Sequence, residues 1–314
     1  KKSEEEIRTF ARYYDVYNTI IIFDAVKWNE NGEMYFVGGE DNFGAQIKAL
    51  KQIITYRTNP HKVNIIVTAL ADGAGGDGHN GVNKLMHANH TGIAEQMVNK
   101  FIKPESEGGF DLDGLDIDWE YPQNKKDWEC YNVFMKELDE KMAAVKDNCI
   151  ISAALSAGAL KMSKETLERI DQIQYMAYDD LNSDGYQSTL YLAQIGLQKF
   201  IKKGAKLSQI NIGIPSYGRP TDGGPYWPYW SSAQGNNLYF DSKYDNVKCG
   251  DVVLDSCAYC SPALAGDKTA LALLSGCGGI MVFRLASDRL MNDPNAVACG
   301  IENSLKRYIP NWGK

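Results

Sequence analysis

The feature that most constrains the fold of this chain is a repeated alternation between short apolar runs and longer amphipathic segments. The first run, Thr-Ile-Ile-Ile-Phe at residues 19–23, is continuous, as is typical of a parallel strand that is buried on both faces. Seven strands are predicted, at residues 19–23, 63–67, 112–120, 150–155, 172–178, 210–214 and 279–283. Helices are predicted around them, at residues 3–14, 47–56, 93–102, 126–145, 164–168, 189–203, 270–274 and 296–308.

This alternation predicts an α/β fold with a parallel sheet. No linker or shift in composition divides the chain, so we expect one domain over residues 1–314. A closed (β/α)8 TIM barrel needs eight strands. Because the chain opens on a predicted helix, we expect the first strand of such a barrel to lie before residue 1. The longest irregular segment, residues 215–262, is rich in Tyr, Trp, Gly and Ser, and long loops in compact domains are often functional.

Charge and hydrophobicity argue against two classes of partner. The formal net charge is -7, whereas binding to a phosphate backbone requires clustered Lys and Arg. No segment approaches the roughly 18 consecutive apolar residues that span a bilayer. We therefore expect neither a nucleic-acid partner nor a membrane partner.

The cysteines bear on location and on metal binding. Seven cysteines and a glycosylation sequon at residues 89–91 favour a secreted or extracytoplasmic protein, although residues 1–6 lack the apolar core of a signal peptide. Cys249, Cys257 and Cys260 suit a local disulfide or, together with Cys277, a zinc site. Cys277 adjoins a predicted strand, so we expect no metal and no cofactor.

Acidic residues recur at every second position in the predicted strand 112–120. Alternation along a strand places Asp116, Asp118 and Glu120 on one face, with adjacent Cα atoms about 6.6 Å apart. Leu115, Ile117 and Trp119 then occupy the other face, where they pack under the outer helices. Three carboxylates this close do not all ionise readily, so at least one pKa rises, as a general acid requires.

The residues alone leave three interpretations of this acidic face open. It is a catalytic site, a magnesium or calcium site, or a solvated surface strand. The regular apolar residues between the acids argue against a surface strand, whereas spacing alone does not separate catalysis from cation binding.

Residues 113–120 match the signature Asp-x-x-Asp-x-Asp-x-Glu at every required position, which resembles the family 18 glycoside hydrolases, the chitinase-like enzymes. Three further segments resemble strand motifs of that family in the same order, at residues 174–179, 213–219 and 278–283. The resemblance covers roughly residues 19 to 290 and implies a TIM barrel. About sixty residues separate the last two motifs, so we expect no large α+β insertion domain and an open groove suited to endo cleavage.

The resemblance implies a retaining, substrate-assisted mechanism, which needs no second carboxylate as nucleophile. Glu120 would protonate the glycosidic oxygen and later activate water. Asp118 would orient the acetamido group of the sugar and stabilise the oxazolinium intermediate, and Asp116 would hold Asp118 and tune its proton. Tyr178 would donate a hydrogen bond to the acetamido oxygen.

Further residues are expected to bind substrate. Phe283 stands where chitinases usually have Trp as the floor of the cleavage subsite, and its ring offers less stacking area. An aromatic cluster at residues 226–230 is expected to form a stacking wall or to pack on itself. The complete set of expected substrate-binding residues is Asp179, Met176, Phe283, Tyr217, Arg219, Tyr121 and Trp227.

Four functions compete on this evidence. The first is an endo-chitinase acting on β-1,4-linked N-acetylglucosamine in chitin or its oligosaccharides. The second is an endo-β-N-acetylglucosaminidase or a peptidoglycan glucosaminidase. The third is a non-catalytic chitin-binding lectin, which typically loses the acid or its Asp partners, and the fourth is a metal-dependent hydrolase. The intact acidic ladder favours the first, and we expect a monomer.

Overall fold

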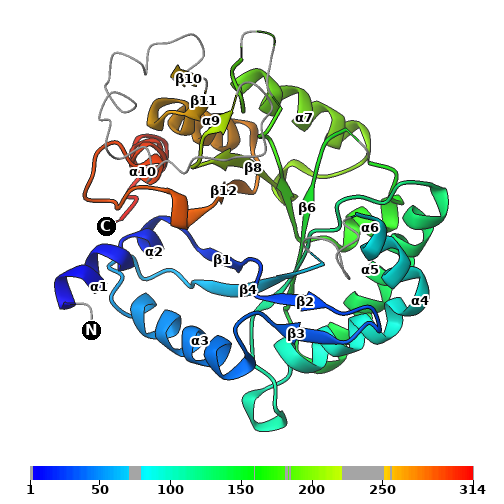
Figure 1. Cartoon of the computed structure of the whole chain (residues 1–314). Helices are drawn as coiled ribbons and strands as arrows, with labels where there is room; N and C mark the ends of the chain where they lie inside the picture. The colour runs from blue at the N-terminus through cyan, green and yellow to red at the C-terminus, as the bar shows by residue number, and fades with distance from the viewer. Residues whose placement is uncertain are drawn as a thin grey trace.

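The computed structural model describes residues 3–70, 79–158, 160–180, 183, 185–220, 251–254 and 257–313, with backbone alone at 79, 80, 220, 251–254 and 257. Its main feature is a curved parallel sheet of seven strands, in the order β1-β4-β5-β6-β7-β8-β12 (Figure 1). The strands are β1 (Thr19–Ile22), β4 (Asn64–Ala69), β5 (Gly114–Ile117), β6 (Ile150–Leu155), β7 (Gln172–Tyr175), β8 (Ile210–Pro215) and β12 (Gly279–Phe283). All seven predicted strands are confirmed, and among the described residues β1 and β12 form the two edges of the sheet.

Two predicted strands are shorter than expected. The prediction of 112–120 contracts to β5, so Asp118 and Glu120 lie beyond its carboxyl end. The prediction of 172–178 contracts to β7, because the chain bends where Ala177 donates its backbone N–H to the carbonyl of Tyr175 at 2.8 Å. Both segments leave the strand ladder at the edge where the carboxyl ends of parallel strands meet.

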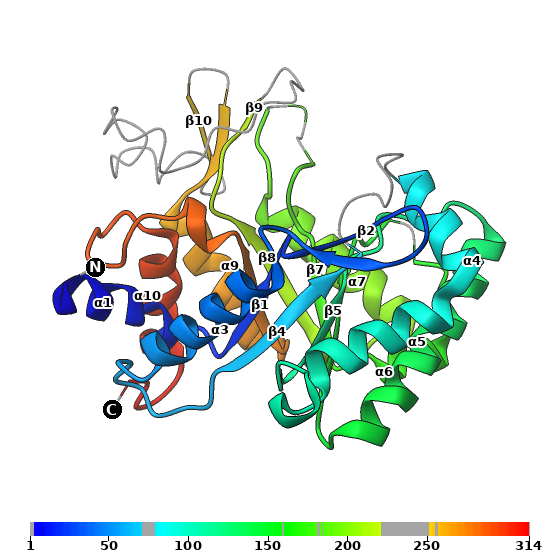
Figure 2. The ribbon, with the colours of Figure 1, turned by 60° about the horizontal axis from the view of Figure 1, so that its bottom comes forward.

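Helices cover the outside of the sheet (Figures 1 and 2). They are α1 (Glu4–Ala11), α2 (Tyr13–Val16), α3 (Glu40–Ile54), α4 (His79–Met97), α5 (Lys125–Val145), α6 (Lys164–Arg169), α7 (Leu190–Lys202), α9 (Pro262–Ser275) and α10 (Val297–Tyr308). The predicted helix 3–14 is divided at Arg12 into α1 and α2. Helices α3, α4 and α9 begin well before their predicted starts. No helix in the described ranges has the length and apolar character needed to cross a bilayer.

Two small antiparallel sheets were not predicted. One is the hairpin of β2 (Val26–Trp28) and β3 (Met34–Phe36). The other pairs β9 (Arg219–Pro220), β11 (Cys257–Cys260) and β10 (Asp251–Leu254), and it projects from one end of the curved sheet (Figure 2). The strands of both sheets have only two to four residues, and such short strands give too brief a pattern to be predicted.

The core lies between the sheet and its covering helices. Leu115, Ile117 and Trp119 are buried there, as the alternation along the strand predicted. Trp119 packs on Tyr131 of α5, with ring centroids 5.5 Å apart, and donates its indole N–H to Asn83 of α4 at 2.8 Å. The apolar side of β5 therefore fixes the strand against α4 and α5 and leaves its acidic side facing the interior of the curved sheet.

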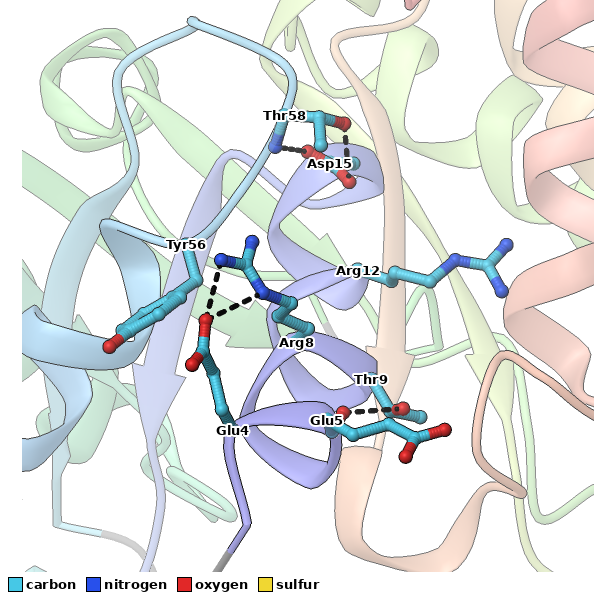
Figure 3. Close-up of a pocket in the computed structure, with 8 residues that line it drawn as sticks. All are labelled: Glu4, Glu5, Arg8, Thr9, Arg12, Asp15, Tyr56 and Thr58. Carbon is cyan, nitrogen blue, oxygen red and sulfur yellow. Dashed lines mark hydrogen bonds and ion pairs between the residues drawn. The ribbon is translucent and has the colours of Figure 1, made fainter.

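Contacts between distant segments hold α1 and α2 against the rest of the fold. Asp15 accepts hydrogen bonds from the backbone N–H groups of Thr58 and Asn59 at 2.6 and 2.7 Å, and Figure 3 shows the Thr58 contact among the residues that line a pocket between the N-terminal helices and the segment after α3. Arg12 donates to the carbonyl of Met291 at 2.7 Å. The N-terminal helices thus connect the segment after α3 to the segment after β12, across the two edges of the sheet.

Candidate active site

The acidic residues of the signature lie at and beyond the carboxyl end of β5. Asp116 belongs to the strand and Asp118 follows it; their exposed fractions are 3% and 6%. Glu120 is partly buried. The negative charges of all three raise the pKa of the hydroxyl of Tyr178, which lies beyond the end of β7. The sequence-predicted acids and Tyr178 are therefore brought together at the carboxyl ends of the strands.

Asp116 lies within the sheet between two hydroxyl donors. Thr68 of β4 donates to one carboxylate oxygen at 2.9 Å, and Ser152 of β6 donates to the other at 2.5 Å. Burial raises the pKa of Asp116, and the two hydrogen bonds act against this rise. Asp116 is thus the deepest acid of the ladder and has both oxygens engaged by neighbouring strands.

Two tyrosines border the acids. Burial raises the pKa of Tyr178 well above its ordinary value, and the nearby charges of Asp118, Asp179 and Glu120 raise it further. Burial also raises the pKa of Tyr121, and its hydroxyl is hydrogen-bonded to Glu120, whose charge adds to the rise. Both phenols remain protonated at ordinary pH, so each is available as a hydrogen-bond donor.

Asp179 has an unusual backbone conformation, with φ of 71°, and it accepts a hydrogen bond of 2.6 Å from Tyr217. Burial raises the pKa of Asp179 to about 6, against the hydrogen bond from Tyr217 and the charge of Arg219. The charge of Glu120 also contributes to the rise. The ionisation of Asp179 is therefore coupled to that of Glu120.

Aromatic rings also gather at the carboxyl ends of the strands. Phe283, the last residue of β12, lies 5.1 Å from Phe23, 5.9 Å from Tyr217 and 6.1 Å from Tyr178, measured between ring centroids. The ring of Phe283 is nearly parallel to that of Tyr178, at 17°. The peptide bonds Glu120–Tyr121 and Phe283–Arg284 are both cis. Phe283 of β12 thus packs against the segments that follow β1, β7 and β8, at the same carboxyl ends of the strands as the acids.

The remaining predicted residues are placed as follows. Met176 is partly buried and lies directly after β7. Arg219 is the first residue of β9, and its positive charge lowers the pKa of Asp179. Trp227 and the aromatic cluster 226–230 lie outside the described residues. Cys249 and the side chain of Cys257 do so as well. Within the described ranges, no group of three or more His, Cys, Asp or Glu side chains is arranged to hold a metal ion.

Sequence reasoning missed a buried lysine behind Tyr178. Lys268 of α9 is fully buried, and its ammonium donates to the carbonyls of Ala177 and Gly213, both at 3.2 Å, and to the hydroxyl of Ser188. Ser188 also donates to the carbonyl of Ala177 at 2.7 Å. A lysine in an apolar helix face is the signal that was available, since Lys is almost never fully buried without partners.

Four polar residues inside the sheet were also missed as a group: Thr68, Ser152, Gln174 and Asn211. Each interrupts an otherwise apolar run, which was the available signal. A polar group buried in a parallel sheet must find hydrogen-bond partners, and these four find them in Asp116 and in one another.

The sequence of this chain is similar to a known protein family and to individual proteins. The sequence model of the glycosyl hydrolases family 18 matches residues 75–288, which is more than half of the chain. A curated relative, Endochitinase 1 of Metarhizium anisopliae, is 26% identical over 223 residues, and the match covers 57% of this chain and 52% of that protein. The chain thus spans about half the length of this relative.

Solved structures show the same fold. A plant class V chitinase mutant from Cycas revoluta in complex with (GlcNAc)3 superposes with a TM-score of 0.71 at 14% identity, covering 96% of both chains. A chitinase-like agglutinin from Robinia pseudoacacia gives a TM-score of 0.69 at 18% identity, covering 93% of this chain and 96% of that one. With the family signature at 113–120 and the family match over 75–288, this chain belongs to the glycosyl hydrolases family 18.

Proposed function

We propose that residues 1–314 form one catalytic domain that hydrolyses β-1,4-linked N-acetylglucosamine in chitin, as a retaining endo-chitinase. The observation that carries the proposal is the complete ladder of Asp116, Asp118 and Glu120 facing Tyr178. Family membership and the chitinases among the relatives support the same substrate class. Structures of similar fold hold N-acetylglucosamine oligosaccharides, which supports these sugars as ligands.

In the first step, Glu120 gives its proton to the glycosidic oxygen, and the bond between that oxygen and C1 breaks. The acetamido oxygen of the same sugar forms the new bond to C1, giving a cyclic oxazolinium ion. In the second step water adds to C1 as its proton passes to Glu120, and the ring opens. Two inversions at C1 leave the anomeric configuration retained, and no metal or cofactor takes part.

The neighbouring residues serve this scheme by holding charges and protons. Asp118, as a carboxylate, stabilises the cationic intermediate and orients the acetamido N–H. Because the pKa of Tyr178 is raised well above its ordinary value, its phenol stays protonated and donates to the acetamido oxygen. The hydroxyl bound to Glu120 belongs to Tyr121, which holds the acid in place for transfer.

The sugar ring rests on the aromatic group around Phe283, with Met176 beside it. Phe283 already packs on three rings, so its orientation is fixed before substrate arrives, which limits the entropy lost on binding. Asp179, Tyr217, Arg219 and Trp227 complete the proposed substrate-binding set. We also propose that the protein acts as a monomer outside the cytoplasm.

A non-catalytic lectin is the second candidate, since a chitinase-like agglutinin shares the fold. The presence of Glu120 with both of its Asp partners favours the enzyme. A related endo-β-N-acetylglucosaminidase or peptidoglycan glucosaminidase would use the same residues, and product analysis on chitin oligosaccharides, N-glycans and peptidoglycan separates these substrates.

The test is hydrolysis of a fluorogenic chitotrioside by the intact chain and by Glu120→Gln. We expect the variant to lose several orders of magnitude in kcat, with no effect of a chelator. The control is Glu129→Gln on the exposed side of α5, which keeps full activity. Oligosaccharide binding without turnover by the intact chain would favour the lectin, and turnover abolished by chelator would favour a metal-dependent hydrolase.

A further inference from the structure

A chain of side-chain hydrogen bonds crosses five neighbouring strands of the sheet and ends on Asp116. Asn211 of β8 donates to Gln174 of β7 at 3.1 Å, Gln174 donates to Ser152 of β6 at 3.1 Å, and Ser152 donates to Asp116. Thr68 of β4 approaches the same carboxyl from the other side. The strand register explains the chain, because Asp116 pairs with Thr68 and Ser152, while Gln174 pairs with Asn211.

The members of this chain are enclosed by the fold. Ser152 is fully buried and Gln174 is 3% exposed, so water does not compete for their hydrogen bonds. Asn211 pairs with Gly279 of β12, where an added Cβ would lie 3.3 Å from the amide oxygen of Asn211. The absence of a side chain at Gly279 therefore leaves room for Asn211 at the end of the chain.

The donors all point toward Asp116. A serine hydroxyl has a single hydrogen, so while Ser152 donates it to Asp116, the Ser152 oxygen can only accept in its contact with Gln174. Gln174 supplies the N–H of that contact, and its second N–H goes to the amide oxygen of Gln172 at 3.1 Å. If the Gln174 amide turned over, its oxygen would take the hydrogen of Ser152. Asn211 opposes this turn by donating to the Gln174 oxygen.

We infer that Gln174 and Asn211 are positioning residues that aim the hydrogen of Ser152 at Asp116 and hold that carboxyl in its hydrogen-bonded, ionised form. Neither residue touches the sugar or the reacting atoms. For its effect on catalysis the inference rests on the proposed function, because Asp116 then holds Asp118. The orientation of Ser152 itself does not depend on any reaction.

Other charges that act on Asp116 remain unchanged when Asn211 is altered. The charge of Asp116 contributes to the raised pKa of two phenols, Tyr131 of α5 and Tyr178 after β7. Asp118 follows Asp116 on the same segment. Thr68 and Ser152 face its two oxygens from β4 and β6. Asn211 gives its side-chain hydrogen bond to Gln174, so a change at Asn211 acts on Asp116 through Gln174 and Ser152.

The test uses Asn211→Leu, which is close in shape, carries no charge and lacks the donor. The ionisation of Asp116 is followed by 13C NMR titration of aspartate carboxyls, with its signal assigned by its loss in Asp116→Asn. We expect the pKa of Asp116 to rise in Asn211→Leu, because Ser152 no longer donates steadily to it. The acid limb of the kcat profile on the chitotrioside moves to higher pH, with kcat about tenfold lower near neutral pH and KM unchanged.

Asn211→Asp, which also lacks the amide donor when ionised, gives the same direction and serves if Asn211→Leu fails to fold. Asn64→Asp at the start of β4 is the control for added charge, since Asn64 lies outside the chain. An unchanged Asp116 titration in both folded Asn211 variants would overturn the inference. The titration of Asp116 needs no turnover, so it tests the inference even if the protein is not an enzyme. Failure of the proposed function is detected separately, as a lack of chitotrioside hydrolysis by the intact chain.

Discussion

Tyr217 donates a hydrogen bond of 2.6 Å to Asp179, and these two residues follow the neighbouring strands β8 and β7. The bond connects the aromatic group around Phe283 to the carboxyl that faces Glu120. It also works against burial, which raises the pKa of Asp179 to about 6. A single hydroxyl thus influences both the position and the ionisation of an acid at the site.

Replacement of Tyr217 by Phe is expected to raise the pKa of Asp179 above about 6, because the hydrogen bond that lowers it is lost. If the ionised form of Asp179 is the active one, the acid limb of the kcat/KM profile moves to higher pH. The profile is measured on the chitotrioside with Tyr191→Phe as control, since Tyr191 is 69% exposed on α7. An acid limb that stays in place in Tyr217→Phe would contradict this assignment.

Asp179→Asn is expected to stabilise the fold at neutral pH. The folded pKa of about 6 exceeds the ordinary 3.8, so the folded state binds the proton more tightly than the unfolded state. The free energy of unfolding contributed by Asp179 is therefore complete below pH 3.8 and is lost as pH rises through about 6. Allowing for solvent screening of a partly exposed group, the gain at pH 7 is about 1–2 kcal/mol.

Urea unfolding of the wild type and Asp179→Asn at pH 4 and pH 7 measures this difference. The two proteins should differ little at pH 4, where Asp179 is largely protonated. A variant that is less stable at pH 7 would mean that the carboxylate of Asp179 is favourably bound in the fold.

The sequence predicted the sheet well because its strands are short apolar runs that alternate with longer amphipathic helices, the pattern of a parallel sheet covered by helices. The acidic ladder was equally visible, since Asp116, Asp118 and Glu120 lie close together in the sequence. The chain from Asn211 to Asp116 was not, because its members come from different strands and meet only through the register between them.

Loop and helix-boundary errors have similar causes. Phe36 of the β2–β3 hairpin packs against Phe43 and also against Phe101 and Phe110, and the last two lie far away in the sequence. The predicted helix at 270–274 is the last part of α9, which begins after Ser261 caps its first turn. Periodicity was weak there, because α9 is apolar on much of its surface.

Two glycines in helices are expected to respond oppositely to alanine. A Cβ at Gly196 of α7 would lie 2.0 Å from the ring of Tyr175, which is buried and bonded through its hydroxyl to Leu192 at 2.8 Å. Gly196→Ala should therefore cost about 2–4 kcal/mol of unfolding free energy. A Cβ at Gly44 of α3 meets Phe110 at an ordinary 3.4 Å, so Gly44→Ala should add about 0.5–1 kcal/mol.

Denaturant titration of both variants gives the comparison, with the slope of the transition checked for constancy. Equal effects of the two changes would show that the contact between α7 and β7 is looser than described. The pair also separates the helix propensity of alanine, which both variants share, from the clash, which only Gly196→Ala introduces.

Lys268→Met is expected to reduce stability and activity together. Methionine keeps the unbranched shape but removes the donors that reach Ala177, Ser188 and Gly213. Two buried carbonyls then lose a charged partner, at a cost of about 2–4 kcal/mol. Ala177 directly precedes Tyr178, so kcat should fall more than KM rises, because the phenol is displaced from the position that the transition state requires.

The control is Lys202→Met, an exposed lysine at the end of α7, which should change neither property. Urea unfolding and chitotrioside kinetics are measured on the same preparations. A stable Lys268→Met with reduced kcat would confine the role of the lysine to Tyr178, whereas an unstable variant with normal kcat would confine it to the packing of α9 on β8. Both properties unchanged would mean that the buried ammonium holds neither.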